Sequence, residues 1–497
     1  MRILTLNPPF KPRFSRSQRS PAVIKSGTMY YPLWLAYATG VLEQAGHEVR
    51  LVDAPAAGLT MEQVEGLASS FAPGLVVIDT STPSIHSDLR VVERLRELVP
   101  QAFICLVGTH VSALARETLS RSSAVDAIAR HEYDFTLREV AALLEAGPRP
   151  APEALARIAG LTYWAGGEVA ETADRPFIDD LDSLPFVSGV YAKHLDIRNY
   201  FYSITQYPEV TIVTGRGCPH RCTYCVYPQT MFGHRFRHRS PENVLQEFWF
   251  IKRRWPEVKE VFIEDDTLSV NRSYCRSLCR LLAAKGPGLP WTANSRADVD
   301  FETLQAMKEA GCRLLCIGVE SGDQAILDNI NKALRLEQVE KFVASARRAG
   351  ILVHACFIVG NRGETRQTME RTLAFAKRLR PDTAQFFPLM VYPGTRAYQW
   401  AQSNNYLTTH DFSEWLTAEG LHNCVVSTPE LSNQDLVDFC DYARRSFYLR
   451  PSYVLAKMGQ VLAHPKEARR VLKASRTFFR YLFRGSGKAD SCGCPRG

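Results

Sequence analysis

The stretch Gly217-Cys218-Pro219-His220-Arg221-Cys222-Thr223-Tyr224-Cys225 carries three thiols at spacings of four and three residues, directly after the apolar run Val210-Thr211-Ile212-Val213-Thr214. Thiolates are soft ligands that select zinc, copper(I) or iron–sulfur clusters. A structural zinc ion needs four protein ligands, but no fourth Cys or His follows at the usual spacing. His220 lies between two of the thiols and is not expected to reach the same metal. Three cysteines on one loop therefore favour a four-iron cluster with one iron left open. The alternative, three core cysteines in chance proximity, fits poorly with the Gly, Pro and Arg residues around them.

Length and composition indicate a globular protein of two or three domains. The chain has 497 residues, of which 45% are hydrophobic and 23% are charged, and these values are ordinary for a protein with large cores. Its thirteen cysteines are odd in number and lack the spacing of a disulfide framework. No signal-peptide pattern follows Met1, so a reducing cytoplasm is expected. No apolar run reaches the ~18 residues that span a bilayer.

The first part of the chain alternates short apolar strands with helices, which predicts a doubly wound (Rossmann-like) α/β domain over residues 1–148. The expected strands are 3–7, 47–53, 75–79, 102–107 and 126–129. Ligands of such sheets bind beyond the carboxyl ends of the strands, where this sequence has residues 7–9, 53, 80–84, 108–110 and 130–132. Gly-x-Gly-x-x-Gly is absent, which argues against a dinucleotide. A connector with a hairpin around Gly166-Gly167 is expected over residues 149–205.

Six further strands alternate with helices in the next part of the chain. They are expected at residues 210–214, 261–264, 291–295, 314–319, 352–359 and 383–391. Six units are too few for an eightfold barrel, so a partial (β/α)6 barrel of the TIM type is expected over residues 206–400. Sites on such barrels lie at the carboxyl ends of the strands, where this chain has Glu264, Asp265, Arg296, Glu320 and Gly360. Carboxylates there can bind an ammonium group and ribose hydroxyls, and an arginine can pair with a carboxylate.

The last region, residues 401–497, is expected to be helical and basic. Its first part, 401–443, reads as a polar helical cap over the barrel mouth. Residues 444–484 contain eleven Lys or Arg and one acid, Glu467, so the net positive charge of this segment is larger than the +8 of the whole chain. Apolar residues recur at three- and four-residue steps in 466–484, as in a basic amphipathic helix at a membrane surface; a helix packed on its own domain is the equal alternative. Nucleic acid is not expected, because no recognition module accompanies the charge.

Two parts of the sequence resemble known domains. The cysteine loop, with Tyr224 before its last thiol, resembles the Cys-x3-Cys-x2-Cys signature of the radical S-adenosylmethionine (SAM) superfamily. The pieces Val107-Gly108-Thr109-His110-Val111-Ser112 and Glu132-Tyr133-Asp134 resemble the cobalamin-binding domain that precedes many radical SAM domains. The chain is thus similar to the class B radical SAM methyltransferases. The usual Asp-x-His-x-x-Gly signature is missing, so His110 is expected to line the cobalamin pocket rather than to ligate cobalt.

The resemblance implies the cofactors and the residues that hold them. The open iron of a [4Fe-4S] cluster would chelate SAM, and reductive cleavage would give a 5′-deoxyadenosyl radical. The implied cluster ligands are Cys218, Cys222 and Cys225, and the implied SAM contacts are Tyr224, Glu264, Asp265, Arg296, Glu320 and Gly360. The implied cobalamin contacts are Pro9, Ser81, Thr82, Gly108, Thr109, His110 and Glu132.

The resemblance also implies a reaction. One SAM would methylate cobalamin and a second would supply the radical, so that a methyl group reaches an unactivated carbon of a lipid, isoprenoid, tetrapyrrole or other secondary metabolite. A cyclase, oxidase or rearrangement enzyme with the same cofactors is the alternative, since the fold does not decide between them. A tRNA-modifying methylthiotransferase is disfavoured, because such proteins usually end in an RNA-binding β-barrel. The expected partners are a small-molecule or lipid substrate and an electron donor such as flavodoxin or ferredoxin. The expected location is the cytoplasm, or the inner face of the membrane as a peripheral protein.

The remaining cysteines are expected to be structural. Cys275 and Cys279, one helical turn apart, are expected in the core rather than around a second cluster. Cys312, Cys316 and Cys356 are likewise expected in the barrel core, with a substrate-facing hydrogen donor as the alternative for Cys316 or Cys356. Cys492 and Cys494 lie on a tail that is expected to be disordered.

Overall fold

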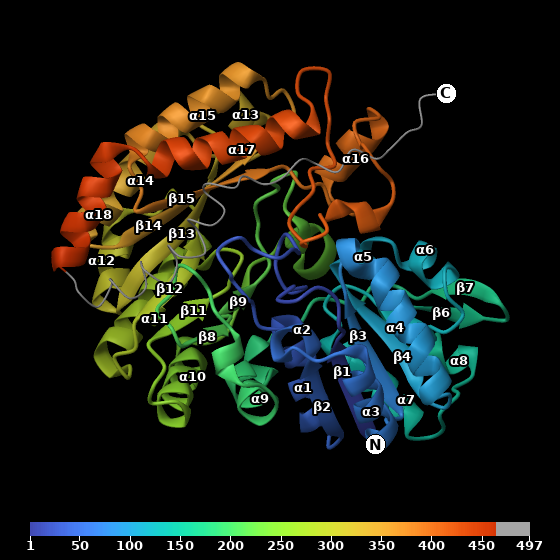
Figure 1. The fold of residues 1–497 in the computed structure, drawn as a ribbon. Helices are drawn as coiled ribbons and strands as arrows, with labels where there is room; N and C mark the ends of the chain where they lie inside the picture. The colour runs from blue at the N-terminus through green and yellow to red at the C-terminus, as the bar shows by residue number, and fades with distance from the viewer. Residues whose placement is uncertain (464–497) are drawn as a thin grey trace, which may run out of the picture.

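Two large sheets stand side by side in the computed structural model, which describes residues 1–463 (Figure 1). Seven strands from the first part of the chain form one sheet, drawn from blue to teal. Six strands from the second part form the other, drawn from green to orange. This arrangement confirms the expected α/β class, with a doubly wound domain ahead of a partial barrel.

The N-terminal sheet has the strand order β2-β1-β3-β4-β5-β6-β7, and its first five strands are parallel. They are β1 (Arg2–Asn7), β2 (Glu48–Asp53), β3 (Leu75–Thr80), β4 (Phe103–Gly108) and β5 (Ala127–Ala129). The main helices are α1 (Leu33–Gln44), α3 (Met61–Phe71), α4 (Ile85–Leu98), α5 (Thr109–Ala113), α6 (Ala115–Ser120) and α7 (Asp134–Leu144). Because α1 packs with α7 and α3 packs with α4, both faces of the sheet are covered, and every residue of β3 and β4 is buried.

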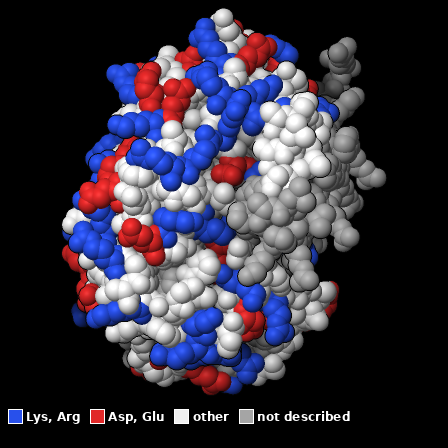
Figure 2. Space-filling model, turned by 90° about the vertical axis from the view of Figure 1, so that its left-hand side faces the viewer, with Lys and Arg blue, Asp and Glu red and all other residues white. Residues whose placement is uncertain are grey.

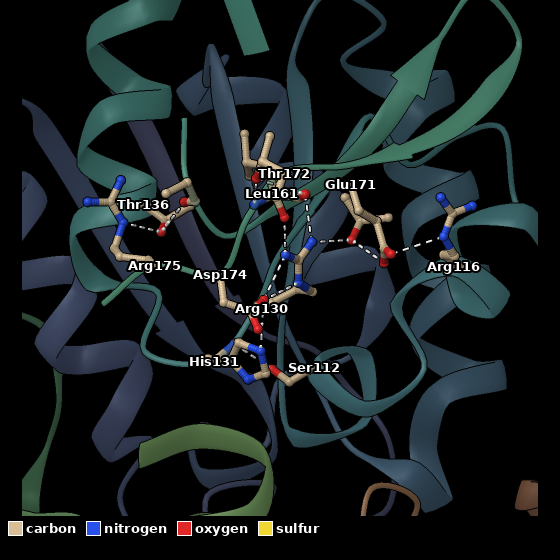
Figure 3. Close-up of polar contacts among 12 residues, drawn as sticks. Ser112, Arg116, Arg130, His131, Thr136, Leu161, Glu171, Thr172, Asp174 and Arg175 are labelled. Carbon is tan, nitrogen blue, oxygen red and sulfur yellow. Dashed lines mark hydrogen bonds and ion pairs between the residues drawn. The ribbon is translucent and has the colours of Figure 1, made fainter. Parts of the chain in front are cut away.

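The hairpin expected in the connector forms an edge of this same sheet. β6 (Leu161–Ala165) pairs antiparallel with β5, and β7 (Glu168–Glu171) pairs with β6. Arg130, directly after β5, holds the hairpin in place. Its guanidinium donates to two backbone carbonyl oxygens of the hairpin segment at 2.6 Å each and pairs with Asp174 at 2.9 Å (Figure 3). The connector therefore contributes two strands to the first sheet, after the short helix α8 (Pro152–Leu155).

The second sheet is entirely parallel, in the order β8-β11-β12-β13-β14-β15. Its strands are β8 (Glu209–Ile212), β11 (Glu260–Ile263), β12 (Trp291–Ser295), β13 (Cys312–Glu320), β14 (Leu352–Val359) and β15 (Thr383–Pro388). The helices that follow the strands are α10 (Pro241–Arg254), α11 (Arg272–Lys285), α12 (Phe301–Glu309), α13 (Gln324–Asn329), α14 (Leu336–Ala349) and α15 (Arg366–Leu379). The six strands match the six expected ones, so the partial barrel is confirmed.

Helix α17 (Asn433–Tyr448) covers β15, the edge strand of this sheet. The Tyr448 hydroxyl donates to the carbonyl oxygen of Ala384 at 2.7 Å and accepts from the amide of the same residue at 3.0 Å. A side chain thus takes the place of a neighbouring strand and protects an exposed edge. Helix α18 (Pro451–Ala463) follows α17 and ends the described part of the chain.

The helical cap expected over residues 401–443 is wrong in part. Helix α16 (Arg396–Ser403) ends near the start of this range, and before α17 the chain contains one short 3-10 helix, η6 (Phe412–Trp415). η6 packs against the N-terminal domain, where the ring centroid of Phe412 lies 5.0 Å from that of His110. Burial of Phe412 and Trp415 against another domain, rather than a helical period, decides the course of this segment.

Charged side chains are mixed over the described surface. Figure 2 shows Lys and Arg spread over one face of the molecule with Asp and Glu between them. The basic amphipathic helix expected at residues 466–484, Cys492 and Cys494 lie outside the described residues. Among the described residues, no helix combines the length and the apolar character needed to cross a membrane.

Candidate functional site

The cysteine loop follows the short strand β9 (Gly215–Arg216), which pairs with β10 (Arg237–His238). Gly217 begins the loop with φ of +85°, and a Cβ atom there would collide with the carbonyl oxygen of Arg235. The turn into the loop therefore requires glycine. Thr223 in the middle of the loop donates its amide to Ile330 and accepts from the amide of Ala397, both at 3.0 Å. Segments that follow β13 and β15 of the second sheet thus fix the loop.

Two side chains hold further carbonyl groups of the loop. His234 donates from Nδ1 toward the carbonyl oxygens of Cys218 and His220, each at 3.1 Å. The Gln229 amide donates to the carbonyl oxygen of Cys225 at 2.7 Å. Sequence reasoning missed both residues, because a neutral His or Gln a few positions beyond a motif gives no signal of its own.

The three thiols lie close to one another in a largely buried environment. Cys218 and Cys222 are buried and Cys225 is half-buried. Burial, and then the Asp266 carboxylate, raise the pKa of Cys218 to about 11, and the same two causes raise the pKa of Cys225. Cys218 and Cys225 are therefore neutral until a metal displaces their protons. Among the described residues, the sulfur atoms of these three thiols do not all lie within 4.8 Å of one another, as the ligands of a single ion would. This wider spacing of the sulfur atoms suits a cluster.

Tyr224 of the loop joins a polar group with Glu320 and Lys332. The Tyr224 hydroxyl donates to Glu320 Oε1 at 2.8 Å, and the Lys332 ammonium donates to the same oxygen at 2.7 Å. Glu320 ends β13 at φ of +69°, beside a register shift, and a Cβ at Gly318 would overlap its carboxylate. Glycine at this position therefore makes room for the acid. The structure brings Tyr224 and Glu320 together, as a joint role in SAM binding would require.

Arg19, from the N-terminal domain, reaches Glu264 at the end of β11. Its guanidinium pairs with Glu264 and, at 3.2 Å, with Asp266. Asn294, at the end of β12, donates to the other oxygen of Glu264 at 3.2 Å. Burial raises the pKa of Glu264, and Arg19 opposes that shift. Arg19 was missed from the sequence, since it lies 245 residues from its partner in a loop without a motif.

Asp265 and Arg296 have partners within the protein. Asp265 accepts from the amide and hydroxyl of Thr214, at 2.7 and 2.5 Å, and burial raises its pKa to about 7. Arg296 donates to the carbonyl oxygens of Lys332 and Ala333 at 2.7 and 2.9 Å. These contacts order the loops on which Cys218 and Lys332 lie, and direct contact of either residue with SAM stays a prediction.

Gly360 lies at the end of β14 with φ of +94°. Its amide donates to Glu364 at 3.2 Å, and an added Cβ would meet Leu436 of α17. The position therefore permits close packing of α17 on the barrel rim. Its contact with SAM stays a prediction.

Most of the residues expected to contact cobalamin gather at the carboxyl end of the N-terminal sheet. Pro9 follows β1, Ser81 and Thr82 follow β3, and Gly108, Thr109 and His110 follow or end β4. His110 Nδ1 lies 3.2 Å from Thr82 Oγ1. Burial lowers the pKa of His110 to about 3, so its imidazole is neutral. A neutral, partnered histidine suits a lining residue, and the polar side chains at the ends of β3 and β4 fit a cobalamin pocket.

Glu132, which follows β5 at the same edge of the sheet, lies in a buried ion cluster between the domains, and its contact with cobalamin stays a prediction. Its two carboxylate oxygens pair with Arg216 and Arg237, each at 2.7 Å. Asp134 pairs with Arg216 at 2.8 Å, and the four side chains are nearly inaccessible to solvent. The sequence could not reveal this arrangement, because the two arginines come from β9 and β10 of the second domain.

Two family descriptions match the chain, "Radical SAM superfamily" over residues 212–376 and "B12 binding domain" over residues 19–141. An uncharacterized methyltransferase of Pyrococcus horikoshii is 30% identical over 457 residues, which cover 92% of this chain and 94% of the relative. The chain belongs to the cobalamin-binding radical SAM family. The resemblance seen in the cysteine loop and the N-terminal domain is thereby confirmed.

Two further proteins place this radical SAM enzyme among its relatives. The anaerobic magnesium-protoporphyrin IX monomethyl ester cyclase of Cereibacter sphaeroides is 27% identical and aligns over 84% of this chain and 67% of its own length. The radical SAM methyltransferase TsrM from Kitasatospora setae, at 18% identity, has a TM-score of 0.62 and shares the fold over 82% of this chain and 77% of its own.

Family membership confirms the expected cofactors, a [4Fe-4S] cluster, SAM and cobalamin, and it makes the protein an enzyme. The methyltransferase interpretation is supported by the first relative. Enzymes of this family act on small molecules with the help of an electron donor.

Proposed function

We propose that this radical SAM enzyme transfers a methyl group to an unactivated carbon of a lipid, isoprenoid, tetrapyrrole or other secondary metabolite. The observation that carries the proposal is the contact between the two predicted cofactor sites. Helix α5, which follows β4, packs on η4 (Pro228–Phe232), the turn directly after the cysteine loop. Ser112 of α5 contacts the Met231 sulfur at 3.7 Å, and His131 Nδ1 lies 2.8 Å from the carbonyl oxygen of Thr230. A methyl donor and a radical source would thus face a common space.

When bound, the cluster with SAM supplies the radical and cobalamin supplies the methyl group. The chain's own residues position these groups. Glu320 presents a carboxylate whose orientation Tyr224 and Lys332 fix. Glu264 presents a second carboxylate, which Arg19 holds from the opposite domain. Carboxylates that are already oriented bind ammonium and hydroxyl groups by charge-assisted hydrogen bonds without further ordering.

Two half-buried tyrosines, Tyr30 and Tyr202, lie near Glu264. The rings of Tyr30 and Tyr202 lie 5.1 Å apart, and Tyr202 packs on Phe262 of β11 at 4.6 Å. Burial raises the pKa of both phenols, so they stay neutral. A neutral aromatic wall suits an apolar substrate.

Anaerobic reconstitution with iron, sulfide and cobalamin, followed by product analysis with SAM and a reductant, tests the proposal. Methyl transfer should give both 5′-deoxyadenosine and S-adenosylhomocysteine. Flavodoxin or ferredoxin should replace the chemical reductant. The protein with Cys218→Ala, Cys222→Ala and Cys225→Ala should make neither product, whereas the Cys275→Ala/Cys279→Ala control should make both.

A cyclase is the second candidate, because the Cereibacter sphaeroides relative is a cyclase. A cyclase, oxidase or rearrangement enzyme would give 5′-deoxyadenosine with bound corrinoid but no S-adenosylhomocysteine. Deoxyadenosine from the triple cysteine variant would contradict both candidates.

The basic segment at residues 466–484 supports peripheral membrane contact and a lipid-like substrate. Binding to vesicles that contain anionic lipid should fall when Arg469, Arg470, Lys473 and Arg476 are changed to Glu. Arg253→Glu/Arg254→Glu, a charge reversal elsewhere on the surface, serves as the control. Unchanged binding of the tail variant would contradict the membrane role and leave the methyl-transfer test unaffected.

A further inference from the structure

Three potential metal ligands meet on neighbouring strands of the barrel, away from the cysteine loop. Cys316 lies on β13, and His354 and Cys356 lie on β14, with Cys316 beside His354 in the register. Among the described residues, they are the one trio of Cys, His, Asp or Glu side chains whose ligand atoms all lie within 4.8 Å of one another. The strand pairing therefore brings together a donor set that local sequence spacing does not show.

The separation of the two sulfur atoms suits a tetrahedral ion. Cys316 Sγ and Cys356 Sγ are 3.9 Å apart. Two thiolates on a tetrahedral zinc ion at about 2.3 Å each would be separated by about 3.8 Å. A disulfide needs a much shorter separation of about 2.05 Å. The two side chains thus stand at the distance that a shared ion requires, without rearrangement of the sheet.

The histidine is oriented by a neighbour on the next strand. His354 Nδ1 lies 2.7 Å from the hydroxyl of Thr383 on β15. A metal-binding histidine usually makes such a contact through its other ring nitrogen, which fixes the tautomer and the ring orientation. In this arrangement Nε2 is the ring nitrogen that would bind the metal.

The trio faces the inside of the barrel. Leu315, Ile317 and Phe357 alternate with the trio along the strands and are fully buried, whereas Cys316 and Cys356 are half-buried. Burial, then Tyr30 and then Cys316 raise the pKa of Tyr202. The contact with Cys316, and then burial, raise the pKa of Cys356, and Glu320 adds to that shift. The trio therefore lies in the same interior as the groups proposed to orient SAM.

We propose that Cys316, His354 and Cys356 bind one divalent ion of zinc type and leave its fourth position open to the barrel interior. Three protein ligands with an open position are typical of zinc sites that bind a further molecule, whereas structural sites have four. An oxygen, nitrogen or sulfur atom of the substrate would occupy the open position and anchor the substrate. The ion site stands independently of the reaction, whereas the anchoring role rests on the proposed function.

Metal analysis of the reconstituted full-length enzyme tests the site. The enzyme is incubated with Zn²⁺, dialysed, and its zinc and iron are counted per chain. Wild type should retain one zinc in addition to the cluster iron. Cys316→Ser, Cys356→Ser and His354→Gln should each lose the zinc and keep the iron, and the retained iron shows that the barrel is folded. Thr383→Val should weaken zinc binding by about 10-fold.

The Cys275→Ser/Cys279→Ser protein is the matched control, because it also removes two cysteines, which are buried on α11. It should keep its zinc. Zinc should also protect Cys316 and Cys356 from alkylation, as measured by mass spectrometry. The proposal is overturned if wild type binds no zinc, if the trio variants keep it, if the control loses it equally, or if Cys316 and Cys356 are recovered as a disulfide. None of these outcomes depends on methyl transfer, so the two proposals can fail separately.

Discussion

Replacing Glu132 by Gln should destabilise the protein while leaving its affinity for cobalamin unchanged. The sequence placed Glu132 among the cobalamin contacts, but the structure places its carboxylate between Arg216 and Arg237 at 2.7 Å each, where it also accepts from the Ile178 amide at 2.8 Å. The substitution keeps the size of the side chain and removes its charge. It therefore separates a cofactor contact from an ionic link between the domains.

The expected loss of stability in Glu132→Gln follows from the burial of the charged side chains around it. The side chains of Glu132, Arg216 and Arg237 are 2%, 1% and 3% exposed, and removal of one partner from a buried ion pair costs about 3–5 kcal/mol. Asp134 remains as a partner of Arg216 at 2.8 Å, and the Gln carbonyl still accepts one hydrogen bond. The expected loss is therefore at the lower end, about 3 kcal/mol.

Urea unfolding of the reconstituted enzyme measures the loss, and titration with cobalamin measures the affinity. The control is Glu97→Gln in the exposed pair with Arg94, whose side chains are 64% and 51% exposed. This change should alter stability by less than about 1 kcal/mol. A Glu132→Gln protein as stable as the control, but with weaker cobalamin binding, would refute the reasoning and restore the cofactor role.

Three further predictions follow from other polar side chains. Burial raises the pKa of Glu209 to about 8. Its contribution to stability is therefore full below its unfolded pKa and is lost as the pH rises through about 8. In urea unfolding, the free energy of unfolding of Glu209→Gln relative to wild type should rise by at most about 1.4 kcal/mol per pH unit across that window. Arg19→Met frees the Glu264 carboxylate and should raise the Kd for SAM by about 10-fold in equilibrium dialysis, equivalent to about 1.4 kcal/mol. Tyr448→Phe removes the hydroxyl that pairs with Ala384 and should cost about 1 kcal/mol in thermal unfolding.

Each of these has a result that would contradict it. A gain for Glu209→Gln that does not vary with pH would mean that the carboxylate stays charged in the folded protein. An unchanged Kd in Arg19→Met would show that Glu264 does not need the arginine to meet SAM. A Tyr448→Phe protein as stable as wild type would mean that water replaces the hydroxyl at the sheet edge.

The sequence predicted the parts of the fold that local patterns encode. Apolar runs of strand length, separated by helices, gave the five parallel strands of the first sheet and all six of the second, with errors of one or two residues at most ends; β15, expected to reach residue 391, ends at Pro388. The spacing of Cys218, Cys222 and Cys225 indicated the cluster, because all three ligands lie on one short loop. Burial of Cys275, Cys279 and Cys312 confirmed their expected place in the core.

The tertiary structure decided the contacts between distant segments. The hairpin joined the first sheet through Arg130, Glu132 became an ionic link, and Arg19 reached Glu264 across the domain boundary. Cys316 and Cys356, expected in the core, are half-buried and face each other across two strands.

The physical reason is the range over which a pattern acts. Periodicity and motif spacing report on neighbours along the chain, whereas the partner of a buried charge or thiol depends on which surfaces pack together. Arg19 and Glu264 are 245 residues apart in sequence, and only the packing of the two domains brings their charges into contact. The sequence alone thus determined the secondary structure and the cluster loop, and the packing of the two sheets determined what surrounds that loop.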